Sequence, residues 1–153
     1  MQKITPFLWF DDNAEEAAQY YVSIFPNSKI LKVARHTEAG PGPAGKVLTV
    51  MFELEGREFT ALNGGPLFKF SEAISFVVSC ETQAEIDRLW RALSAGGKEG
   101  QCGWVRDKYG LWWQLVPPLL TELLSGSDRV RAARVMQVMM KMAKLDIAAL
   151  RDA

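Results

Sequence analysis

The stretch ITPFLWFDDNAEEAAQYYVSIFPNSKI, residues 4–30, decides the fold because it joins a buried strand directly to an amphipathic helix. Ile4 to Phe10 is a nearly continuous apolar run of the kind that forms a buried strand. Asn13, followed three residues later by Glu16, is a variant of the capping box and marks a helix start. Apolar side chains then recur at the spacing of one helix face: Ala17, Tyr20, Tyr21 and Ile24. The pattern predicts a strand, a short connection and a helix.

The same pattern returns 69 residues later in AISFVVSCETQAEIDRLWRALSAGG, residues 73–97. Thr82 and Glu85 take the places of Asn13 and Glu16, and the following helix again carries one apolar face. Two glycines then end the helix. Two strand–cap–helix units in one register suggest an internal duplication.

Short strands are predicted after each helix. In the first half they cover residues 28–35, 47–54 and 57–63, with a loop rich in Gly and Pro at 38–46; in the second half they cover 103–106 and 111–116. The first half therefore has the order βαβββ. The repeat gives the shorter second half the same βαβββ order, although only two of its three strands after the helix have a signal in the sequence. The fold class is α+β with curved mixed sheets. The remaining chain is predicted to be helical, with a short helix over 119–124, a second from Asp128, and residues 145–150 extending or following it.

These predictions combine into one domain over residues 1–153. Module one spans about 1–70, module two about 71–118 and a C-terminal helical tail about 119–153. At 17.1 kDa the chain has the size of one average domain.

Composition excludes several classes of protein. Eighteen basic and 18 acidic residues give a net charge of zero, which argues against nucleic-acid binders and proteins of anionic membranes. We expect no membrane span and no signal peptide, since the apolar runs are too short. Two cysteines are too few for a disulfide scaffold, so a cytoplasmic location with free thiols is expected. The single histidine, His36, excludes a His-rich metal site.

Paired βαβββ modules resemble the glyoxalase, or vicinal-oxygen-chelate, superfamily. Three stretches are similar to its PhnB-like branch, often called demethylubiquinone methyltransferase-like: residues 4–30, GWVRDKYGLWWQLVP at 103–117, and RVMQVMMKMAKLDIAAL at 134–150. The resemblance implies a cavity formed by the curved sheets and a homodimer. The methyltransferase label is not carried over, because the chain has no Gly-rich strand-to-helix turn for a nucleotide-like cofactor.

The resemblance also implies where metal ligands would lie, on the first and fourth strands of each module. The first-strand places fall near Pro6 and Ser75, which are related by the 69-residue repeat. The fourth-strand places fall near Thr60 and Gln114, which lie 54 residues apart, as do the turn glycines Gly56 and Gly110. Proline has no ligand atom, and hydroxyl and amide groups are weak ligands for divalent cations. We therefore expect neither a metal nor another cofactor.

Six residues are candidates for lining a ligand cavity: Gln114, Thr60, Ser75, Trp112, Trp104 and Asn63. Strand alternation places Trp112 and Gln114 on one face, where the amide either contacts a ligand or is a satisfied interior group. Ser75 reads most simply as a hydroxyl bonded within the sheet, and the tryptophans line either a pocket or the core. Asn63 either offers its amide at the cavity mouth or makes a turn.

Three functions remain open. The first is metal-independent binding of a small molecule in an apolar cavity. The second is a lyase, isomerase or dioxygenase whose metal is held by Glu53, Glu55 or Glu58 with His36. The third is an interaction protein acting through the Met-rich C-terminal helix. The pair Arg106 and Asp107 is expected as an exposed ion pair at a turn, where it contributes little.

Overall fold

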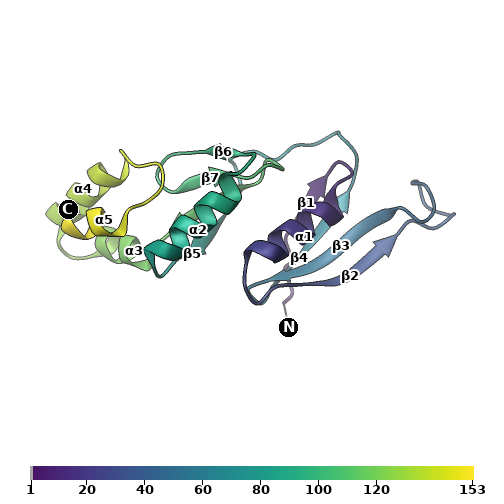
Figure 1. Ribbon diagram of the computed structural model, residues 1–153, viewed down its shortest axis with the longest axis horizontal. Coiled ribbons are helices and arrows are strands. Elements are labelled where there is room, and N and C mark those ends of the chain that lie inside the picture. The colour runs from purple at the N-terminus through teal and green to yellow at the C-terminus, as the bar shows by residue number, and fades with distance from the viewer. Residues whose placement is uncertain (1) are drawn as a thin grey trace. The chain divides into compact units, whose positions relative to one another are not determined.

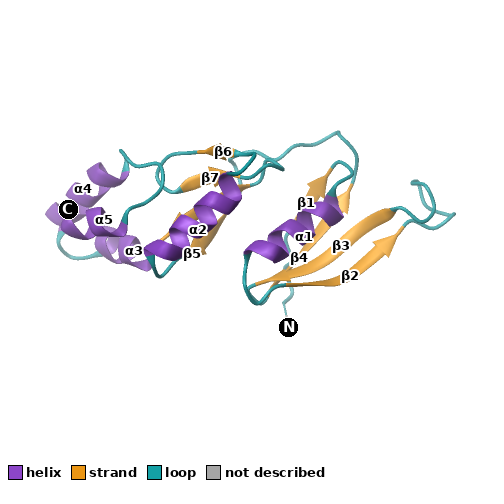
Figure 2. Cartoon of the chain, viewed as in Figure 1, coloured by secondary structure: helices purple, strands orange, loops and turns teal. Residues whose placement is uncertain are grey.

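The computed structural model describes residues 2–153 and contains two compact units. One runs to Lys69 and the other from Phe70 to Ala153 (Figure 1). Each unit contains a four-stranded mixed sheet and a helix packed against it, in the order βαβββ (Figure 2). The α+β class and the repeated βαβββ order predicted from the sequence are confirmed.

The first unit is built from a single helix on one sheet. Its elements are β1 (Phe7–Phe10), α1 (Ala14–Ile24), β2 (Lys29–Arg35), β3 (Val47–Leu54) and β4 (Arg57–Asn63). The strand order is β1-β4-β3-β2, with β1 parallel to β4 and the other pairs antiparallel. Helix α1 packs on β3 and β4, and its buried Tyr21 stacks on Phe52. The opposite face of this sheet is not covered by α1.

Strand β1 begins at Phe7 rather than at the predicted Ile4. Pro6 has no N–H for a sheet hydrogen bond, although its carbonyl accepts one from Thr60 N at 3.0 Å. Before Pro6, the side chain of Gln2 takes the place of a neighbouring strand beside Glu58. Gln2 Nε2 donates to Glu58 O, and Gln2 Oε1 accepts from Glu58 N. A side-chain amide therefore continues the sheet edge where the strand itself cannot.

The second unit repeats the order with shorter strands. Its elements are β5 (Ser75–Ser79), α2 (Gln83–Ser94), β6 (Lys98–Glu99), β7 (Trp104–Arg106) and β8 (Trp112–Val116). The order β5-β8-β7-β6 matches that of the first sheet, and β5 is parallel to β8. The two-residue β6 has too few residues to give a period-2 signal, and the sequence did not predict it.

The two predicted helix caps have different outcomes. Thr82 caps α2 as predicted, with its Oγ1 accepting from Glu85 N at 3.2 Å. Asn13 occupies the N-cap position of α1 as predicted, but its side chain makes no capping hydrogen bond, so the predicted capping box is not formed. Asn63, at the end of β4, takes over the role: its Oδ1 accepts a hydrogen bond from Ala14 N at 2.8 Å. The first helix is therefore capped by a residue 49 positions away in the sequence.

The strand pairing corrects the repeat register. Thr60 lies opposite Phe7 on β1, and Gln114 lies opposite Val77 on β5. Phe7 and Val77 are both exposed, at 59% and 61%, and they lie 70 residues apart. The helices keep the 69-residue repeat, so the two strand-to-helix connections differ by one residue. Pro6 is consequently not the counterpart of Ser75, contrary to our expectation.

Asp107 is buried rather than part of an exposed ion pair. Only 1% of the residue is exposed. Its Oδ1 accepts from Tyr109 N at 2.8 Å and from Leu111 N at 3.1 Å, and its Oδ2 accepts from Trp113 Nε1 at 2.9 Å. The carboxylate thus fixes the turn between β7 and β8 and joins it to a core indole.

The C-terminal region folds as three short helices on the second unit: α3 (Pro118–Ser125), α4 (Arg129–Met139) and α5 (Ile147–Asp152). Helix α5 is separate from α4, and Leu145 lies in the connection between them. A small apolar core holds the helices together, made of Leu120, Val135, Leu145 and Leu150. Val116 of β8 packs against this cluster, which joins the tail to the sheet.

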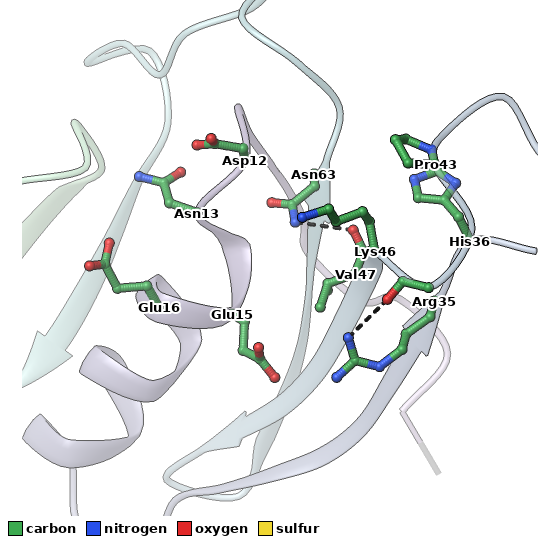
Figure 3. Close-up of a pocket in the computed structure, with 11 residues that line it drawn as sticks. Asp12, Asn13, Glu15, Glu16, Arg35, His36, Pro43, Lys46, Val47 and Asn63 are labelled. Carbon is green, nitrogen blue, oxygen red and sulfur yellow. Dashed lines mark hydrogen bonds between the residues drawn. The ribbon is translucent and has the colours of Figure 1, made fainter.

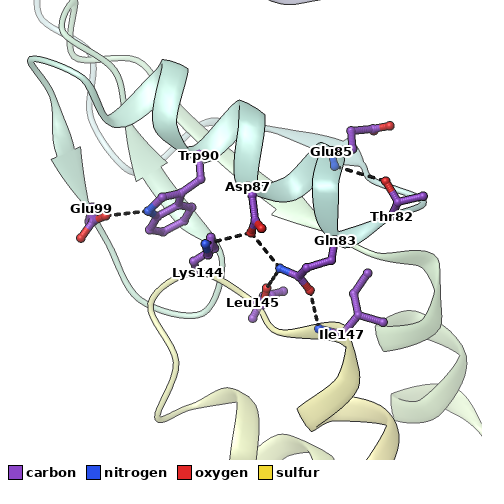
Figure 4. Close-up of polar contacts among 9 residues, drawn as sticks. All are labelled: Thr82, Gln83, Glu85, Asp87, Trp90, Glu99, Lys144, Leu145 and Ile147. Carbon is purple, nitrogen blue, oxygen red and sulfur yellow. Dashed lines mark hydrogen bonds and ion pairs between the residues drawn. The ribbon is translucent and has the colours of Figure 1, made fainter.

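Polar contacts also attach the tail to α2 (Figure 4). Gln83 donates to Leu145 O at 3.0 Å and accepts from Ile147 N at 2.8 Å, so one side chain binds two backbone groups of the tail. Lys144 Nζ lies 2.8 Å from Asp87 Oδ1. The lysine contact and the Gln83 hydrogen bond hold the pKa of the Asp87 carboxyl below its usual value.

Candidate functional site

The face of the second sheet opposite α2 is the strongest candidate site. We call it the open face of the second sheet, and define it by Ser75, Val77, Trp104, Arg106, Trp112 and Gln114. Of the residues that alternate with them, Val105, Trp113 and Leu115 are buried on the side of α2. Strand alternation therefore separates a packed core face from a face with polar and aromatic groups.

Gln114 and Ser75 are the polar centre of this face. Gln114 Nε2 lies 2.9 Å from Ser75 Oγ, a hydrogen bond between neighbouring parallel strands. Both residues are partly exposed. The Gln114 side chain also has a carbonyl oxygen, and a serine hydroxyl can both donate and accept. The pair thus presents neutral donor and acceptor groups.

Two tryptophans flank this polar pair. Trp104 lies directly opposite Gln114 on β7, and its ring is 6.2 Å from the ring of Trp112 at an interplanar angle of 64°. Trp112 is only 8% exposed, whereas Trp104 is partly exposed. A Cβ added at Gly100 would lie 3.1 Å from the Trp112 ring, so the glycine leaves room for that indole. Four predicted site residues therefore share one face: Ser75, Trp104, Trp112 and Gln114.

Thr60 and Asn63 lie in the first unit, on opposite faces of its sheet. Thr60 is on the face away from α1, between Phe7 of β1 and Met51 of β3. Trp9 lies on the same face, where its Nε1 donates to Gly65 O at 2.9 Å and its ring contacts Phe68 edge-on. This face also combines a hydroxyl with apolar and aromatic side chains.

Asn63 faces α1, and both ends of its side-chain amide are hydrogen-bonded within the first unit. Its Oδ1 caps α1, and its Nδ2 donates to Val47 O at 3.1 Å. The residue lies at the base of an open polar groove of about 890 Å³ (Figure 3). Carboxylates line the α1 side of the groove, at Asp12, Glu15 and Glu16. The cations of Arg35 and Lys46 line the side of the β2–β3 hairpin, together with the imidazole of His36. The sequence did not predict this groove, whose lining is polar and mixed in charge.

We expect Asn63→Ala to destabilise the first unit by about 1–2 kcal/mol, because it removes the α1 cap and a link to β3. Asn13→Ala is the matched control and is expected to cost less than about 0.5 kcal/mol, since its side chain does not cap the helix. Urea unfolding followed by far-UV circular dichroism measures both changes. Equal losses of stability for the two variants would contradict the role given to Asn63.

Comparison with known proteins identifies the family. The family model for 3-demethylubiquinone-9 3-methyltransferase matches residues 2–116. A PhnB protein of Bacillus cereus is 39% identical over 76% of this chain and 99% of its own, with a TM-score of 0.69. The chain belongs to this PhnB family. Its fold is the glyoxalase-like fold, so the resemblance stated from the sequence is confirmed.

More distant structures share the fold of this PhnB family member. A protein of Pseudomonas aeruginosa is 20% identical, with a TM-score of 0.63 over 76% of this chain and 98% of its own. The fosfomycin resistance protein FosX of Listeria monocytogenes, in complex with Mn(II) and sulfate, is 14% identical, with a TM-score of 0.53 over 76% and 91% of the two chains. No curated protein matches the chain. The family model ends at Val116, just before the helical tail.

The residues that the sequence resemblance assigns to metal positions do not fit a divalent cation. Thr60, Gln114 and Ser75 supply hydroxyl and amide groups only, and two of them are hydrogen-bonded to each other. Within residues 2–153, no three His, Cys, Asp or Glu side chains are grouped to hold a metal ion. Glu53 and Glu58 face each other across β3 and β4, whereas His36 adjoins Lys46 at the far end of the hairpin. The alternative ligand set is therefore not brought together.

Cys80 adds no nucleophile to the open face of the second sheet. Cys80 and Cys102 are both free thiols. Burial raises the pKa of the Cys80 thiol to about 12, with the nearby Glu85 carboxylate adding to the shift. Cys80 is therefore a protonated core residue at neutral pH. In the described part of the chain, residues 2–153, no helix has the length and apolar character needed to cross a membrane.

Proposed function

We propose that the chain binds a small molecule without a metal, in an apolar cavity lined by the open face of the second sheet. The observation that carries the proposal is the Gln114–Ser75 hydrogen bond beside the rings of Trp104 and Trp112. Small-molecule sites are mostly apolar and aromatic, with a few polar groups that orient the ligand. This face has that composition.

Exposure of apolar side chains supports the proposal. Val77 lies next to Gln114 and is 61% exposed, whereas Trp113 and Leu115, on the α2 side of the partner strand, are buried. Covering apolar surface is favourable by roughly 25 cal/mol per Å², so a planar apolar ligand gains free energy by lying on these groups. Thr60, with Phe7 and Trp9, gives the first sheet a similar surface. We propose Thr60 as the polar contact of that surface of the first sheet.

A homodimer and a cytoplasmic location belong to the same proposal. The family resemblance implies the dimer, and exposed apolar groups at Ile4 and Phe7 support association. Two free cysteines support a reducing compartment. Methyl transfer is not proposed, since neither strand-to-helix connection contains a glycine.

One observation favours interaction through the tail as a second candidate function. Helix α4 and its end expose three large apolar side chains, namely Val130, Met136 and Met140, of which Val130 is 70% exposed. Methionines adapt to irregular partner surfaces. Deletion of residues 128–153 would abolish dimerisation on this hypothesis.

The test is binding of 2-naphthamide, a neutral planar probe, by protein purified without a chelator or a His tag. We expect quenching of tryptophan fluorescence and a rise in Tm that are the same in EDTA and in added Mn²⁺ or Zn²⁺. Elemental analysis should show no stoichiometric divalent metal. Probe binding that requires one bound metal ion per chain, or no binding at all, would overturn the proposal.

Substitution of Gln114 assigns the probe to the open face. Gln114→Leu removes the amide and is expected to weaken binding by about 5–20-fold, the effect of losing one buried hydrogen bond. Gln137→Leu makes the same chemical change on the exposed side of α4 and should leave the dissociation constant unchanged. An equal effect of both substitutions would place the probe elsewhere.

A further inference from the structure

A pair of cations lies on the open face of the second sheet, beside its aromatic groups. Arg106 of β7 is directly opposite Trp112 on one side and directly opposite Lys98 of β6 on the other. Residues paired in this way point to the same face of a sheet. One row across the sheet therefore contains Ser75, Trp112, Arg106 and Lys98, in that order.

The neighbouring residues confirm which face the cations occupy. Glu99, next to Lys98, points toward α2, where its Oε1 accepts from Trp90 Nε1. Val105, next to Arg106, is fully buried on the same side. Alternation along both strands therefore directs Lys98 and Arg106 away from the helix and onto the open face.

Within residues 2–153, neither Lys98 nor Arg106 forms an ion pair. The ion pair formed in this unit joins Lys144 to Asp87, on the other side of the sheet, beside α2. The nearest acidic neighbours in the strands are Glu99, bonded to Trp90, and Asp107, bonded to Trp113. Like charges that face each other across two strands are destabilising, at Cβ separations of about 5 Å. An anion between Lys98 and Arg106 would offset that repulsion.

We propose that the ligand of this site is a planar aromatic anion, whose ring lies against Trp104 and Trp112 and whose carboxylate binds Arg106 and Lys98. Arginine favours carboxylates because its planar guanidinium donates two parallel hydrogen bonds. The adjacent row supplies the neutral Gln114 and Ser75 for a ring hydroxyl or carbonyl. The inference rests on the proposed function and adds the charge class of the ligand.

The test compares two probes that differ only in charge, 2-naphthoate and 2-naphthamide, at pH 7.5 and 50 mM salt. We expect naphthoate to bind at least 10-fold more tightly than naphthamide. Raising the salt concentration to 0.5 M should reduce this ratio, since added ions screen the cations. Naphthamide measures the aromatic surface alone, so failure of the proposed function appears as loss of binding by both probes.

The double variant Lys98→Gln with Arg106→Gln isolates the cations. Naphthoate affinity is expected to fall about 10-fold, whereas naphthamide affinity changes less than twofold. Arg134→Gln with Lys141→Gln makes the same change in net charge on the exposed tail and should preserve the ratio between the probes. Lys98 on an edge strand could instead serve only to prevent pairing with other chains. A wild-type ratio below about 2, or a ratio unaffected by the double variant, would overturn the inference.

Discussion

Asp107→Ala is expected to destabilise the second unit by about 3–5 kcal/mol, because hydrogen bonds to a buried charged acceptor are strong and their donors stay buried. Asp107 accepts from Tyr109 N, Leu111 N and Trp113 Nε1. Removing the carboxylate leaves two backbone N–H groups and an indole N–H without this acceptor. Urea unfolding followed by tryptophan fluorescence measures the loss. A change below about 1 kcal/mol would contradict the role assigned to the buried carboxylate.

Asp107→Asn distinguishes the contribution of the turn hydrogen bonds from that of the hydrogen bond to the Trp113 indole. The amide oxygen can still accept from Tyr109 N and Leu111 N, but the amide nitrogen then faces Trp113 Nε1, donor against donor. We expect an intermediate loss of about 1–3 kcal/mol. Trp113→Phe removes the indole donor, so adding it to Asp107→Asn should cost less than the sum of the two single changes.

The sequence predicts the hairpin of the first unit well because its signals are local. The predicted bounds of β3 and β4, residues 47–54 and 57–63, agree with the structure. Residues 47–54 are a nearly continuous apolar run and residues 57–63 return after a turn, in which Glu55 and Gly56 have positive φ angles of 50° and 79°. The alternation that places Gln114 beside Trp112 on one face is local in the same way, and the structure agrees.

Predictions fail where a side chain acts over a long range. Asn13 has the sequence of a cap, but Asn63 arrives from another strand and binds Ala14 N instead. Asp107 shows the spacing of a turn, yet its burial depends on Trp113 reaching its Oδ2 from the next strand. In both cases the sequence alone indicates the local turn or helix start, but it does not show which distant side chain will form the hydrogen bond.

The candidate site could be located only once the pairing register of the strands was known, because the residue types alone do not show which side chains are neighbours. Ser75 and Gln114 were each predicted, but only the pairing of β5 with β8 places them 2.9 Å apart. Lys98 could not be assigned to the site, because β6 has two residues and no periodic signal. The shift from a 69- to a 70-residue repeat likewise follows from the strand pairing.

Leu145→Ala is expected to cost about 2–5 kcal/mol and to loosen the whole tail, because it leaves a cavity in a core of only four buried side chains. Leu145 is fully buried, and its side chain also contacts Gly103 at the start of β7. Val130→Ala is the control: Val130 lies in the same tail but is exposed, so its loss should change stability by less than about 0.5 kcal/mol.

The same variant tests how strongly the tail is coupled to the sheet that carries the candidate site. Cys102 N donates to Met142 O and Gly103 N to Ala143 O, both at 2.8 Å, and Gln83 binds the backbone at Leu145 and Ile147. A loosened tail therefore exposes backbone donors of the segment leading into β7. We expect Leu145→Ala to make the chain sensitive to limited proteolysis between residues 126 and 146, and to weaken 2-naphthamide binding through Trp104. Tail cleavage with unchanged probe affinity would show that the sheet holds its site without the tail.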